Sequence, residues 1–167
     1  SVPGGVSLDF LVFEPNPLTV YYEIGNTGTP QEKGLRQRFG LLHSQFTGND
    51  DVLSLEYVTS NFKTTNAVLG SYQFRVTDDN RVRGGIMGSW NKFVNDQFGE
   101  EFIDYTGYSW SAGGQLNFNI YQDGPFFVDL VPGVNYQKVK VSNELLNNSA
   151  IAGFLLPYAQ LQASRQD

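Results

Sequence analysis

Cysteine, charged residues and long apolar runs are all scarce in this sequence. It has no cysteine, which rules out a disulfide framework. Only 17% of the residues are charged, below the usual quarter, and the net charge of −6 argues against a nucleic-acid partner. The longest nearly unbroken apolar run, residues 150–159, is about half of the ~20 residues that a membrane-spanning helix requires.

Groups suited to catalysis or metal binding are also few. The single histidine, His43, is adjacent to Ser44 in a predicted strand, so their side chains point to opposite faces and cannot form a nucleophile–base pair. The acidic residues between 96 and 104 lack EF-hand spacing and are expected to be solvated. We therefore expect no enzyme activity, no cofactor and no metal ion. The first five residues do not resemble an export signal, so a leader would lie outside this sequence.

Strict alternation of apolar and polar residues dominates what is present. It is clearest in two stretches, 106–120 and 126–136, separated by the hairpin signal Gln122-Asp123-Gly124. A period of two indicates β-strands. The second stretch would extend for roughly 33 Å. Tilted by about 45°, it would rise roughly 23 Å, close to the ~25 Å apolar band of an outer-membrane β-barrel.

These two strands are therefore predicted to cross a membrane, since strands of soluble proteins usually have only about five or six residues. Their polar side would face the barrel interior. Their lipid-facing series would be Tyr108, Trp110, Leu116, Phe118, Ile120, Phe126, Val128 and Leu130.

The same pattern predicts eight long strands in a meander, with no helix. The expected ranges are 18–25, 34–46, 52–61, 67–76, 81–94, 106–120, 126–137 and 151–162. The last strand is apolar on both faces, so the sequence does not predict which of its faces meets lipid. A short strand at 6–13 precedes them, followed by a linker with two prolines, which cannot sit in a central ladder.

Connection lengths alternate along the chain. Tight turns are predicted at 47–50, 78–80 and 122–124, and mostly longer connections at 26–33, 63–66, 95–101 and 142–149. Outer-membrane barrels have short turns on the periplasmic side and longer loops outside. The first strand is therefore expected to start in the periplasm.

Seven charged residues fall on the polar sides of the predicted strands. Pairing the first two strands across their loop places Glu23 roughly opposite Arg36. Such residues would either form a charged pore wall or fill a narrow barrel with ion pairs, because a charge in a lumen needs a partner or water. The expected lumen-facing charged residues are Glu23, Arg36, Arg38, Glu56, Arg75, Arg83 and Asp129.

The order of motifs over residues 3–76 resembles a known family. VSLDFLVFE is followed by prolines, then YYEIGNTGT, GLRQRFGL, TGNDDVLSLEYVTSNF and SYQFRV. This is similar to the start of the barrel in two-partner secretion transporters of the haemolysin-activator type, within the outer-membrane assembly-factor superfamily. The resemblance implies that residues 1–17 end a periplasmic domain and linker, and that residues 18–167 are strands of a sixteen-stranded barrel, about half of it.

The fold expected is thus all-β: an antiparallel transmembrane β-barrel of eight long meander strands, closed alone or half of a larger barrel. The leading hypothesis is a secretion pore in the bacterial outer membrane, whose partners are membrane lipid and an unfolded secreted polypeptide. Two alternatives remain. One is a complete eight-stranded outer-membrane barrel with a structural or adhesive role, and the other is a soluble, lipocalin-like ligand-binding barrel with its apolar series turned inward.

Overall fold

The structure, a computed structural model, describes residues 16–25, 35–60, 62, 65–95, 105–143 and 148–165. The short strand expected at 6–13 and the acidic loop at 96–104 lie outside these residues. The described part is all-β, as predicted. It contains no helix that could cross a membrane.

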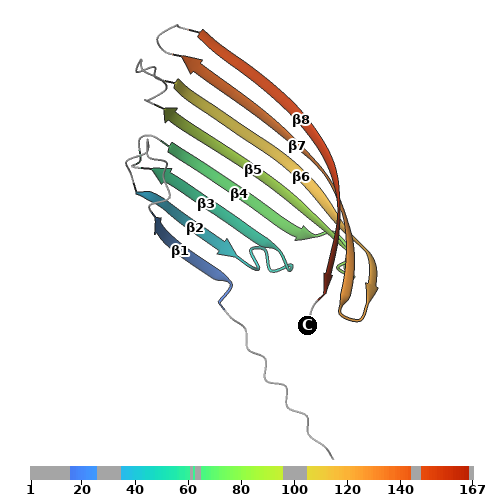
Figure 1. Ribbon diagram of the computed structural model, residues 1–167. Coiled ribbons are helices and arrows are strands. Elements are labelled where there is room, and N and C mark those ends of the chain that lie inside the picture. The colour runs from blue at the N-terminus through green and yellow to red at the C-terminus, as the bar shows by residue number, and fades with distance from the viewer. Residues whose placement is uncertain are drawn as a thin grey trace, which may run out of the picture.

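Eight strands form one antiparallel sheet in sequence order, which confirms the predicted meander. Figure 1 shows them side by side in a curved sheet with β1 and β8 at its two edges. The strands are β1 (Leu18–Gly25), β2 (Arg36–His43), β3 (Val52–Ser60), β4 (Thr65–Arg75), β5 (Val82–Asn95), β6 (Tyr105–Asp123), β7 (Phe126–Asn143) and β8 (Asn148–Arg165).

The later strands are longer than predicted. β6 has 19 residues, and β7 and β8 have 18 each. Residues 142, 143, 148 and 149, expected in a loop, belong to β7 and β8, and the polar stretch at 63–66 already contains the first residues of β4. Polar composition suggested loops there, but pairing with a neighbouring strand outweighs composition.

The hairpin between β6 and β7 turns later than predicted. Asp123 still pairs with Phe126, so the loop is Gly124-Pro125 rather than Gln122-Asp123-Gly124. Gly124 has φ +54°, a conformation that glycine adopts without a Cβ clash. Further along, the β6–β7 pairing has a β-bulge at Ile120, and its register has no pair opposite Pro132, which lacks the N–H that a ladder requires.

The register sorts the residues onto two faces, because directly paired residues lie on the same side of a sheet. We name the apolar face from the row Val20, Leu41, Leu55, Gly70, Gly88, Ala112, Tyr136 and Leu155. We name the polar face from the row Glu23, Arg38, Val58, Ala67, Asn91, Ser109, Val139 and Ala152. The loop end of the sheet is where β1 ends, and the turn end holds the connections 44–51, 76–81 and 124–125.

The sheet is a single open layer. β1 pairs only with β2, and β8 only with β7, so the sheet does not close on itself as a complete eight-stranded barrel would. Among the described residues, the only buried hydrophobic side chains are Val58 and Val131. The dry core of a soluble barrel is therefore not formed by the described residues.

Candidate membrane interface and polar wall

Of the eight residues predicted to face lipid, seven lie on the apolar face by the register, and Ile120 has no directly paired residue. Six of the eight are exposed, from 37% at Leu130 to 55% at Ile120, and Phe118 and Val128 are half-buried. The bulge makes Ile120 an extra residue, after which Tyr121 pairs with Val128. The apolar face of β8 is now defined as well, since Ile151, Leu155 and Leu161 lie on it, exposed by 59%, 66% and 68%.

An aromatic row crosses six strands at the loop end of the apolar face. Directly paired positions in it are Tyr22, Phe39, Tyr57, Val68, Trp90 and Trp110. The ring centroids of Tyr22 and Phe39 are 4.8 Å apart, and those of Phe39 and Tyr57 are 6.2 Å apart. Trp110 also contacts Tyr136 of β7, at 5.3 Å between centroids.

The next row toward the loop end is largely polar. From β2 to β7 it contains Gln37, Thr59, Asn66, Lys92, Tyr108 and Lys140. The hydroxyl of Tyr22 donates to Gln37 Oε1 (3.1 Å), and that of Tyr57 donates to Asn66 Oδ1 (2.7 Å). The tyrosines therefore span the boundary, with rings on the apolar side and hydroxyls on the polar side, as in the interfacial belts of membrane proteins.

A second group of aromatic residues lies toward the turn end of this face. Phe46 contacts Tyr72 at 6.4 Å between centroids, and Tyr72 contacts Phe74 at 5.6 Å. Tyr121 and Phe126 are in contact at the end of the last hairpin, at 6.3 Å. The apolar face is thus bordered by aromatic side chains toward both of its ends, which is the arrangement of membrane β-barrels.

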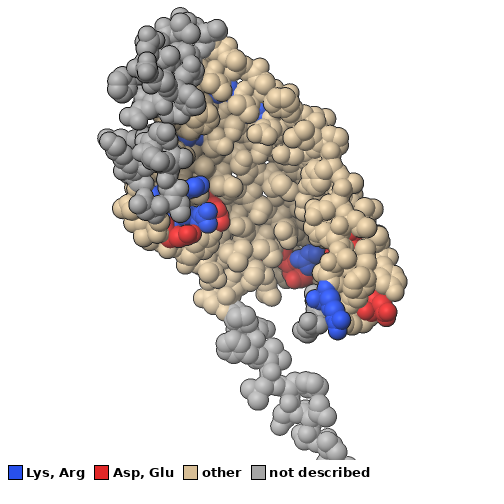
Figure 2. Space-filling model, viewed as in Figure 1, with Lys and Arg blue, Asp and Glu red and all other residues tan. Residues whose placement is uncertain are grey.

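All seven residues predicted to line a lumen lie on the polar face. The predicted partner of Glu23 is wrong, because Glu23 pairs with Arg38 and Arg36 lies opposite Gly25. The prediction missed this since it fixed the register by loop length alone. Arg38 Nη1 lies 3.3 Å from Glu23 Oε2, and its Nε lies 3.9 Å from Glu56 Oε2. Figure 2 shows charged side chains gathered at a few places, with wide uncharged areas between them.

The polar face is hollowed in its middle. A depression of about 350 Å³ is lined mainly by small and polar side chains, among them Ser71, Ser89, Ser111 and Asn135. Ser89 Oγ and Ser111 Oγ are hydrogen-bonded at 2.8 Å across β5 and β6. The Oδ1 atom of Asn135 is buried without a hydrogen-bond partner.

Aromatic rings lie on glycines of the neighbouring strand at directly paired positions. On the polar face these pairs are Tyr21 with Gly40, Phe93 with Gly107, and Tyr158 with Gly133; Phe74 covers Gly84 on the apolar face. Each of these rings thus lies over the backbone of the neighbouring strand. Which ring covers which glycine depends on the register, so the sequence alone does not give these pairs.

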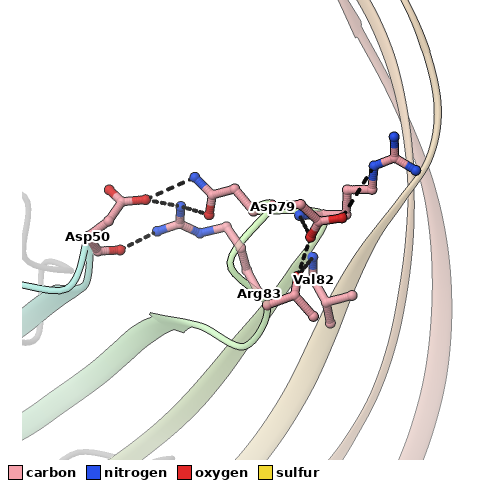
Figure 3. Close-up of polar contacts among 7 residues, drawn as sticks. Asp50, Asp79, Val82 and Arg83 are labelled. Carbon is pink, nitrogen blue, oxygen red and sulfur yellow. Dashed lines mark hydrogen bonds and ion pairs between the residues drawn. The ribbon is translucent and has the colours of Figure 1, made fainter.

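Two turns are joined by Arg83, one of the predicted lumen residues. Figure 3 shows its guanidinium reaching the carboxylate of Asp50 in the β2–β3 connection. Arg83 Nη1 donates to Asp50 Oδ2 and Nη2 to the Asp50 carbonyl oxygen, both at 2.8 Å, and Asn80 Nδ2 also donates to Asp50 Oδ2 (3.1 Å). The hydrogen bonds from Asn80 and Arg83 hold the pKa of Asp50 below its ordinary value.

The acidic residues of the turns have further partners. Asp51 is fully buried, and its carboxylate accepts hydrogen bonds from Thr47 N (3.0 Å) and the Tyr72 hydroxyl (2.8 Å). Burial opposes its ionisation, but these hydrogen bonds outweigh burial and the pKa of Asp51 is lowered. Asp79 binds Thr77 Oγ1 and Arg81 N, which lower its pKa. These residues form turns, as the sequence indicated.

His43 and Ser44 make separate contacts. His43 Nδ1 accepts a hydrogen bond from Gln45 N at 3.3 Å, and Ser44 N donates to Pro17 O at 2.9 Å. No group of three or more potential metal ligands occurs among the described residues. Known protein families, curated protein sequences and solved structures contain no match to this chain. The family resemblance therefore stays a prediction.

Proposed function

We propose that this chain is part of the wall of an outer-membrane β-barrel that conducts an unfolded polypeptide, as in the haemolysin-activator type of transporter. One observation carries the proposal: the described residues form a single layer whose apolar face is exposed. A sheet must bury its apolar face against another layer or against lipid. The described residues provide no such layer.

Lipid is favoured as the covering medium by the borders of that face. Aromatic residues lie toward both ends, and polar side chains follow directly at the loop end. β7 gives the clearest boundary, because its apolar series ends at Tyr136 and continues with Lys138 and Lys140. The apolar part from Phe126 to Tyr136 has the length estimated above for a bilayer.

A polypeptide conduit is favoured by the opposite face. It carries charges of both signs, small hydroxyl side chains and a depression, and its exposed apolar side chains include Phe154 and Leu156 of β8. The unpaired edges of β1 and β8 support a place in a larger barrel, since β8 is 18 residues long and β1 only 8. Closing one onto the other would leave much of β8 unpaired.

Tryptophan fluorescence tests the membrane part of this proposal. The sequence has only two tryptophans, Trp90 and Trp110, and they are paired on the apolar face. The chain would be folded from urea into phosphatidylcholine vesicles carrying bromine at defined acyl positions. We expect a blue-shifted emission and quenching that is strongest for bromine near the headgroup. The membrane location would be contradicted if the chain were monodisperse without detergent and brominated lipid did not quench its fluorescence.

The conduit is tested separately in planar bilayers. If copies of the chain complete a barrel, we expect ion conductance, which falls when an unfolded polypeptide is added. Insertion without conductance would mean either that other strands must complete the barrel or that the chain has a structural or adhesive role. It would also remove the support for transport by this chain alone.

A further inference from the structure

The three lysines among the described residues, Lys92, Lys138 and Lys140, lie together on the apolar face at its loop end. Lys92 and Lys140 are the direct neighbours of Tyr108 on β5 and β7, and Lys138 is the direct neighbour of Trp110. They therefore form one cluster across three adjacent strands, although 46 positions separate Lys92 from Lys138 in the numbering.

Lys138 continues the aromatic row on β7, and Lys92 and Lys140 lie in the next row toward the loop end. Lys92 Nζ is 5.5 Å from the centre of the Tyr108 ring, a cation–π contact that holds the ammonium group near the sheet surface. Lys138 and Lys140 are exposed. Long lysine stems can cover apolar surface while their ammonium groups extend to the aqueous boundary. This is the level at which lipid headgroups would lie if the proposed function is correct.

The described residues of the same surface do not balance the charge of the cluster. Among the described residues, the carboxylates on the apolar face are Asp51 and Asp123, both at the turn end. The arginines Arg36, Arg38, Arg75 and Arg83 are on the polar face, and Arg165, opposite Phe126, is at the turn end of the apolar face. In a chain of net charge −6, three positive charges at one lipid-facing boundary, none of them in an ion pair with a described residue, favour an anionic ligand there.

We propose that Lys92, Lys138 and Lys140, together with Tyr108, bind the phosphate groups of a lipid in the leaflet at the loop end. With the first strand starting in the periplasm, as the sequence predicts, this is the outer leaflet, whose ligand would be a phosphorylated glycolipid. Ammonium groups bind phosphate as point charges, and the Tyr108 hydroxyl can donate a further hydrogen bond. This inference rests on the proposed membrane location.

The test uses the full chain in neutral detergent micelles, titrated with a bisphosphorylated diglucosamine lipid and followed by native mass spectrometry. Each lysine near an anionic surface contributes about fivefold to binding, so K138Q/K140Q should weaken binding roughly 25-fold. The matched control is R36Q/R75Q, which removes the same charge from the polar face and should change binding less than about threefold. The difference should shrink in high salt.

Three outcomes would overturn the inference. They are an equal loss in both double variants, unchanged binding in K138Q/K140Q, and displacement of the lipid by equimolar inorganic phosphate. Quenching by brominated lipid, measured on the same variants, separates this result from the proposed function. A chain that inserts normally but does not bind the glycolipid contradicts only the lysine site, whereas a chain that never inserts contradicts both.

Discussion

The ring of Tyr21 covers Gly40 so closely that a Cβ atom at Gly40 would lie 2.0 Å from Tyr21 Cζ. The two residues are directly paired on β1 and β2, and the Tyr21 hydroxyl donates a hydrogen bond to the carboxylate of Glu56 on β3. One tyrosine thus connects three strands on the polar face while lying flat. The same glycine–ring arrangement recurs at Gly107 and Gly133, where aromatic side chains protect otherwise bare backbone.

Substituting Gly40 by alanine should therefore destabilise the sheet, because the new methyl group displaces the Tyr21 ring. We expect a loss of about 1–3 kcal/mol in the free energy of unfolding, measured by urea titration in vesicles or micelles. Gly88→Ala is the matched control, since its Cβ would meet only Ser111 O, at 3.5 Å. Equal effects of the two substitutions would show that the Tyr21 contact is not tight.

The bridge between Asp50 and Arg83 should make stability depend on pH. The pKa of Asp50 is lowered in the folded chain, so its contribution is present above the unfolded value of about 3.9 and is lost as the pH falls through the folded value. Asp50→Asn should cost about 1 kcal/mol at pH 7, because the pair is partly exposed and solvent screens it. Its difference from the wild type should shrink toward pH 2.

The control for this bridge is Arg81→Gln, which removes a more exposed ion pair with Asp79 (3.5 Å) and should change stability little. If Asp50→Asn has the same effect at pH 7 and pH 2, the charge of Asp50 does not stabilise the turns. Urea titrations at several pH values, with both variants in parallel, measure this.

Adjacent lysine substitutions distinguish the two faces of β6. Leu116→Lys places a charge in the middle of the apolar face and should cost about 2–4 kcal/mol in a bilayer. Asn117→Lys, on the polar face, should be nearly neutral. Leu116 is 41% exposed, so in a soluble protein both substitutions would be tolerated. Folding yields and unfolding free energies in vesicles check this, and equal tolerance would argue against lipid on the apolar face.

Pro132→Ala should restore a hydrogen bond between β6 and β7. The register of these strands has no pair at Pro132, whereas the β7–β8 register includes Pro132 opposite Ala159. The new N–H should therefore point to β6 and exchange slowly with solvent. Global stability is a poor measure, because alanine also increases the entropy of the unfolded chain and offsets the gain. Amide hydrogen exchange at residue 132 is the direct readout, and rapid exchange would show that the gap persists.

The family resemblance and the outer-membrane location are still hypotheses, but the sequence correctly predicted much of the sheet. Local alternation determined that the chain forms eight meander strands and which residues share a face, because successive side chains of a strand point to opposite sides. Glu23 and Arg38 could thus be assigned to the same face from the sequence. Lys138 and Lys140 could also have been placed on the apolar face from the alternation that leads to Tyr136.

Only the tertiary structure decided which residues meet across strands. Glu23 meets Arg38 rather than Arg36, Tyr21 covers Gly40, Arg83 reaches Asp50 from 33 residues away, and the lysines of β5 and β7 gather around Tyr108. Register depends on pairing energies summed along whole strands, and a shift of one residue would exchange the faces of every pair. Whether a sheet closes depends further on curvature and on its edge strands, which local alternation does not encode.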